Sequence, residues 1–222
     1  MQQPDPELRM LWHGDWAAVL GCIGQLRNAI AAFDVALAAS REYGSRDAEG
    51  QLMLNCAVTL RNAGQLDRSL AMARAGHHLS VPERSQAEAL PIGRLVVARD
   101  ASETGQYAEA LTELDATLAE FERRHASFWV QAARMVLARM WLDLGQFARA
   151  LPLLGDDAAD LPAWLQADRR LLRLDLAVAL ESPAPAGLLD QALALTAQDV
   201  VRGPALQVRA MRHQDAAVVL AK

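Results

Sequence analysis

The sequence has little cysteine, few aromatic residues and no basic excess, and each shortage excludes a class of protein. Two cysteines in 222 residues are too few for a disulfide-stabilised secreted domain, and they fit a reducing compartment. Aromatic residues make up only 5% of the chain, and β-branched residues are also comparatively scarce, which disfavours a strand-rich fold. The net charge of −5 argues against direct nucleic-acid binding, which needs a basic surface for the phosphates.

Long apolar runs are missing as well. No window holds 18 uninterrupted apolar residues, so we expect no membrane span, and the first residues do not resemble a signal peptide. We therefore expect a cytoplasmic protein. In contrast, the chain contains 44 alanines and 35 leucines, both strong helix formers. An all-α fold is the leading class before any pattern is considered.

A repeated glycine motif divides the chain into units of about forty residues. Glycine followed by glutamine and then by Leu, Tyr or Phe occurs four times, with spacings of 40, 41 and 40 residues, at Gly24, Gly64, Gly105 and Gly145. Alanine always stands seven residues before this glycine, and a small residue, Ala or Ser, stands five residues after it. This pattern predicts two antiparallel helices joined by a tight turn at the glycine, with small side chains where they pack closely.

These units resemble the tetratricopeptide repeat (TPR). The best match is the segment 24–37, which has the Gly, Ala, Phe and second Ala of the consensus second helix at Gly24, Ala29, Phe33 and Ala36. The resemblance implies a right-handed α-solenoid of stacked helical hairpins. Because the period exceeds the usual 34 residues, the units also look like those in the sensor arms of large bacterial signalling ATPases and transcription activators.

We expect one superhelical domain over residues 1–222, built from five hairpins and one extra helix. The expected repeats are 6–43, 46–78, 83–124, 127–157 and 162–199, followed by a helix over 204–221. Pro91 should kink or break the first helix of the third hairpin. In the fifth repeat the turn glycine is either displaced to Gly187 or replaced by Pro183 and Pro185. The last helix has no partner helix, so we expect a piece of a longer protein, or a homodimer through this end.

No catalytic or metal-binding motif is present, so we expect neither an enzyme nor a cofactor. His77 and His78 are expected at a helix end, where the dipole favours the charged imidazolium. Cys56 occupies a position that is apolar in the other copies, including Trp16. We therefore interpret both Cys56 and Trp16 as core residues.

In TPR proteins the first helix of each hairpin usually lines a concave face that receives the ligand. When the copies are aligned on their glycines, this face is apolar with Asn and Arg along its edge. Arg99 and Arg139 are also four residues before an acid, so both could instead be ordinary surface ion pairs. The candidate groove residues are Asn55, Asn62, Ile92, Leu95, Val96, Arg99, Met135, Val136 and Arg139.

Two functions agree with this surface. The first is a non-catalytic scaffold that binds a protein, as a peptide or helix in the groove, or that associates with itself. The alternative is the effector-sensing arm of a larger bacterial regulator, which would bind a small molecule. The chaperone-tail clamp found in some TPR proteins needs several lysines and is excluded, because Lys222 is the only lysine in the chain.

Overall fold

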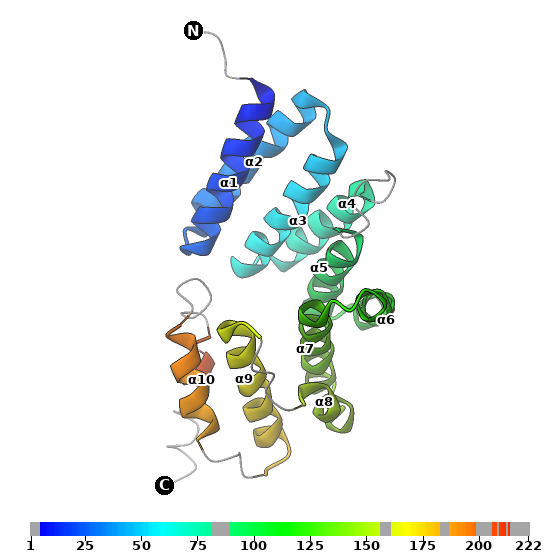
Figure 1. The fold of residues 1–222 in the computed structure, drawn as a ribbon, viewed down its shortest axis with the longest axis vertical. Helices are drawn as coiled ribbons and strands as arrows, with labels where there is room; N and C mark the ends of the chain where they lie inside the picture. The colour runs from blue at the N-terminus through cyan, green and yellow to red at the C-terminus, as the bar shows by residue number, and fades with distance from the viewer. Residues whose placement is uncertain are drawn as a thin grey trace. The chain divides into compact units, whose positions relative to one another are not determined.

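The computed structural model is entirely helical over the residues it describes, which are 5–80, 89–155, 161–182, 187–198 and, apart from 208 and 212, 206–213. No helix in these ranges combines the length and apolar character needed to cross a membrane. The ten helices with assigned bounds are α1 (Pro6–Cys22), α2 (Leu26–Tyr43), α3 (Arg46–Asn62), α4 (Leu66–Ser80), α5 (Ala89–Glu103), α6 (Tyr107–Arg123), α7 (Ser127–Asp143), α8 (Phe147–Leu154), α9 (Ala163–Ala179) and α10 (Leu188–Thr196) (Figure 1).

Consecutive helices pack as hairpins, α1 with α2, α3 with α4, and so on to α9 with α10. The chain forms two compact units, Met1–His125 and Ala126–Lys222. Unit 1 contains the first three hairpins, and unit 2 contains the last two together with the helical stretch at 206–213. The single superhelical domain over residues 1–222 stays a prediction.

The predicted glycine turns end the first helix of each of the first four hairpins. Gly24, Gly64, Gly105 and Gly145 all have the left-handed backbone, with φ between 68° and 78°. In each turn the glycine amide donates to the carbonyl three residues earlier, and the following glutamine amide donates to the carbonyl five residues earlier. These bonds satisfy carbonyls that the helix end leaves free, and only glycine adopts this backbone without strain.

The fifth turn is not formed at the displaced glycine, which was one of its two expected forms. The residue that ends α9 is Glu181, with φ 50°; its amide donates to Val178 and that of Ser182 donates to Ala177, the pattern seen in the glycine turns. Glu181 also stands two residues beyond its helix, as each turn glycine does. Gly187 has φ 73° but precedes α10, while 183–186 lie outside the described residues. The residue with the left-handed backbone directly after α9 is therefore Glu181 and not a displaced glycine, and the proline alternative concerns residues outside the described part of the chain.

The small residues of the repeat lie where helices pack closely. The alanines seven residues before the turn have no exposed surface, nor do the small residues five after it. In unit 1, Ala17 and Ala29 belong to a core cluster that also includes Leu20, Phe33 and Leu37. Unit 2 has clusters around Leu165 and Leu172 and around Leu171 and Leu188. The fully buried positions are Ala17, Ala57, Ala98, Ala138, Ala29, Ser69, Ala110 and Ala150.

Two of the predicted helix features extend beyond the described ranges. The helix expected from residue 83 is described from Ala89 on, and it runs without a break past Pro91 to Glu103. Residues 83–88 lie outside the described residues. The expected final helix is seen in part, at 206–213, and its remainder also lies outside them.

Candidate protein-binding surface

The exposed sides of α3 and α5 form the part of the predicted groove that lies in unit 1. Asn55 and Asn62 are on α3, seven residues and about two turns apart, so they share one face, and both are exposed. Ile92 and Val96 are half-buried on α5, one turn apart, and Arg99 is exposed one turn further on. The helices α3 and α5 contact each other. We call these five residues the α3–α5 strip.

Two of the predicted groove residues belong to the core instead. Leu95 is 8% exposed and Met135 is 4% exposed, and Met135 packs in the cluster of Leu165 and Leu172. Both stand ten residues before the turn glycine, as does the buried Leu54. Asn55 and Val96 stand one residue later in the repeat. A step of one residue rotates the side chain by about 100° around the helix axis, so the neighbouring Leu54 and Leu95 point into the protein.

The charged residues of the strip are held by ion pairs. The Arg99 Nε lies 3.1 Å from the Glu103 Oε1 four residues later, the pair that the sequence predicts. Arg61 also approaches Glu103, with its Nε 3.9 Å from the same oxygen. The α3–α5 strip therefore ends in a cluster of two arginines and one glutamate, in which a ligand carboxylate would have to compete with Glu103.

In unit 2, Arg139 belongs to a separate ion-pair network, while Val136 is half-buried on α7. The Arg139 Nη1 lies 2.8 Å from the Asp175 Oδ2 on α9. The same aspartate is bound by Arg209 and by the His213 Nε2 at 2.8 Å, and Arg209 also pairs with Asp168. Arg139 thus links α7 to α9 instead of standing alone at the edge of a groove.

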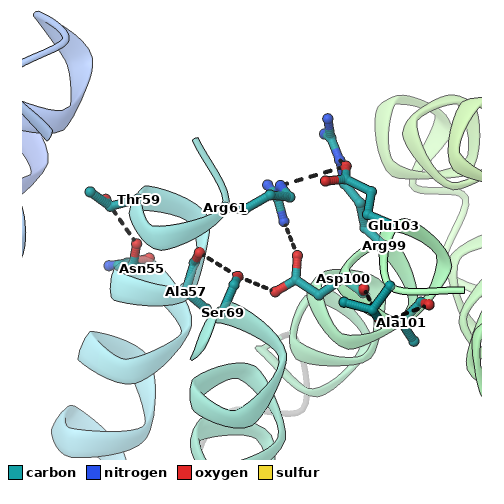
Figure 2. Close-up of polar contacts among 10 residues, drawn as sticks. Asn55, Ala57, Thr59, Arg61, Ser69, Arg99, Asp100, Ala101 and Glu103 are labelled. Atoms are coloured by element: carbon teal, nitrogen blue, oxygen red, sulfur yellow. Dashed lines mark hydrogen bonds and ion pairs between the residues drawn. The ribbon is translucent and has the colours of Figure 1, made fainter. Parts of the chain in front are cut away.

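Beneath the α3–α5 strip lies a buried polar network that sequence reasoning missed (Figure 2). The Asp100 carboxylate on α5 is 1% exposed and lies 2.5 Å from the Arg61 Nη1 on α3. The Ser69 hydroxyl on α4 lies 2.5 Å from the Asp100 Oδ2 and 2.6 Å from the Ala57 carbonyl oxygen, two acceptors for its one proton. Burial, followed by the charge of Arg99, lowers the pKa of Arg61, while Asp100 acts in the opposite direction.

This network ties all three helices around the strip together. Asp100 stands next to Arg99 and three residues before Glu103, and its contacts join this part of α5 to α3 and α4. The signal in the sequence is weak: Ser69 replaces the alanine of the other copies, and Asp100 replaces Val19, Thr59 and Met140. A charge at a buried position needs a partner, but the sequence does not tell which residue supplies it.

The predicted chemistry at histidine and cysteine is partly corrected. Cys56 is buried, as expected, and burial raises the pKa of its thiol to about 11. His77 is half-buried near the end of α4, and burial, with a smaller effect from Arg94, lowers its pKa. Burial thus shifts the pKa of His77 in the direction opposite to the one expected from the helix dipole. Among the described residues no group of three His, Cys, Asp or Glu side chains could hold a metal ion.

The aromatic residues of α1 are a second correction. Trp16 was expected in the core, but it is 46% exposed, and Trp12 stacks on it from one turn away with 62% of its surface exposed. The equivalent residues Cys56 and Val97 are buried. The sequence pattern identified the position correctly, but it did not take into account that no hairpin precedes α1 among the described residues.

Comparison with known proteins identifies the fold. A putative kinesin light chain protein from Podosopora anserina with nearly identical TPR-like repeats superposes with a TM-score of 0.62 at 19% identity, covering 89% of this chain and 98% of the other. A variant of that protein gives a TM-score of 0.60 at 18% identity, covering 96% and 100%. The fold is a TPR-like repeat array. No protein-family profile and no curated protein sequence matches the chain.

Proposed function

We propose that this TPR-like chain is a non-catalytic scaffold for protein–protein interaction, and that the α3–α5 strip holds a peptide or helix of its partner. The observation that carries the proposal is the combination of two exposed amides on α3 with half-buried aliphatic side chains on α5. An amide side chain both donates and accepts hydrogen bonds, so Asn55 and Asn62 can pair with the backbone of a bound segment. Ile92 and Val96 would contact its apolar side chains.

Val136 and Arg139, which the sequence pattern assigned to the same groove, lie on α7 in unit 2, and their part in binding stays a prediction. The alternative function, an effector-sensing arm of a bacterial regulator, rests on the length of the repeat. No contact among the described residues favours it, and a small-molecule effector is therefore the second choice.

A peptide-library selection tests the proposal. We expect the full chain to enrich segments of one recognisable pattern, with apolar residues at fixed spacing. Replacing Asn55 and Asn62 with alanine should weaken the selected peptide at least tenfold, measured by fluorescence polarisation. The matched control is Asn28→Ala, an exposed asparagine on α2. Equal loss in the control, or a selection without any pattern, would contradict the proposal.

A further inference from the structure

Helix α1 carries a stripe of exposed apolar side chains. Leu8, Trp12, Trp16 and Val19 on α1, and Ile23 directly after the helix, follow one another at intervals of three or four residues. The four helical residues therefore lie within an arc of about 80°. Each of the five is between 46% and 63% exposed, and no charged residue of α1 falls inside the arc. We call these five residues the α1 stripe. Contiguous apolar surface of this kind marks an interaction site.

The positions equivalent to the centre of the α1 stripe are buried in the other two hairpins of unit 1. Counted back from the turn glycine, the three central residues of the stripe have equivalents on α3 and α5 that are buried against the preceding hairpin. On α3, Leu52 and Cys56 belong to the core cluster that includes Phe33 and Ala36 of α2, and on α5 Asp100 accepts a hydrogen bond from Ser69 of α4. The equivalents of Trp12, Trp16 and Val19 are Leu52, Cys56 and Thr59 on α3 and Gly93, Val97 and Asp100 on α5.

We propose that the α1 stripe is covered by the α1 stripe of a second copy of this chain, with the two helices antiparallel about a two-fold axis. The stripe is close to symmetric about its midpoint between residues 15 and 16. An antiparallel pair therefore places Leu8 opposite Ile23 of the second copy, and the large Trp12 opposite the smaller Val19. Trp16 lies near the axis. A self-complementary patch of this kind is what a two-fold interface requires.

Charge and area both agree with this occupant. Asp5 at the N-terminal end of α1 is exposed, and the turn at the other end of the helix is followed by exposed Arg27. An antiparallel pair brings these opposite charges together, whereas a parallel pair would bring the two acidic ends together. The exposed stripe amounts to on the order of 600 Å² of apolar side chain per copy, compared with about 800 Å² per partner in a standard stable interface.

Sedimentation of the full chain tests the proposal. At about 50 μM we expect a dimer, and Val19→Arg should raise its dissociation constant at least tenfold. The melting temperatures of the variant and of the unchanged protein should agree at concentrations at which both are monomeric. The matched control is Val178→Arg on α9, because Val178 is also an exposed valine, 57% against 49%, and lies outside the stripe. This variant should remain dimeric.

The arrangement of the two helices is tested by charge reversal. Arg27→Glu should weaken the dimer, and adding Asp5→Arg to the same chain should restore it. A chain that stays monomeric at several hundred micromolar overturns the proposal, as does a dimer that resists Val19→Arg or dissociates equally with Val178→Arg. Because the α1 stripe and the α3–α5 strip share no residue, this proposal and the peptide-binding proposal can fail independently.

Discussion

The turn at Glu181 provides a direct test of the fold, because a glutamate there has the backbone that glycine has in the other four hairpins. Its φ of 50° lies in the left-handed region, which costs a residue with a Cβ roughly 1–2 kcal/mol. Glycine removes this strain but makes the unfolded chain more flexible, which costs about 0.4–1 kcal/mol. Glu181→Gly should therefore stabilise the protein by about 1 kcal/mol.

The matched control is Glu181→Ala. It removes the acidic side chain from a helix C-terminus, where a negative charge is unfavourable, but it keeps the Cβ and hence the strain. The difference between the glycine and alanine variants isolates the backbone effect. In the opposite direction, Gly105→Ala should destabilise the protein by a similar amount, because Gly105 has φ 77°, which strains any residue with a Cβ. Nothing lies within 4 Å of an added Cβ, so no steric clash adds to this cost.

Urea unfolding followed by circular dichroism gives the free energies, and a thermal scan gives a second measure. For a chain of this length, 1 kcal/mol corresponds to a shift in melting temperature of about 2–4 °C. The reasoning is refuted if Glu181→Gly is no more stable than Glu181→Ala, or if Gly105→Ala is as stable as the unchanged protein.

Two further predictions concern buried groups in unit 1. Asp100→Ala should destabilise the protein by about 3–5 kcal/mol in urea unfolding, because it leaves the buried Arg61 charge without its carboxylate; the exposed Asp34→Ala should cost little, and equal costs would contradict the role of the network. With a thiol reagent at pH 8, we expect exposed Cys22 to react quickly and buried Cys56 slowly. A pKa raised to about 11 keeps Cys56 in the unreactive thiol form until the pH approaches that value, and two equally fast cysteines would disprove this.

The helices could be predicted because their signal is local and repeated. Each turn glycine marks the end of one helix and the start of the next, and the buried alanines seven residues earlier fix which face packs. Glu181 could not be predicted in the same way. Glycine is favoured in a left-handed turn but is not obligatory, and a turn made by another residue leaves no signature in a single sequence.

The candidate site was predicted less well, because it depends on neighbours that the pattern does not name. Averaging over copies correctly placed Asn55 and Arg99 at the surface, but it assigned Leu95 to the same face although it is one residue out of register. It also treated Trp16 like Cys56, although α1 has no preceding hairpin among the described residues. The Arg61–Asp100 pair spans 39 residues, and neither residue belongs to the shared motif.

The hairpins of this chain share one repeat period but are not interchangeable. An array rebuilt with the second hairpin replaced by a copy of the first would set Ala29 and Gly21 where Ser69 and Arg61 now stand, leaving the Asp100 carboxylate enclosed with neither of its side-chain partners. Such a shuffled chain should fail at this one junction even though every hairpin in it is native. Modular engineering of the scaffold would therefore have to treat the second and third hairpins as one inseparable block.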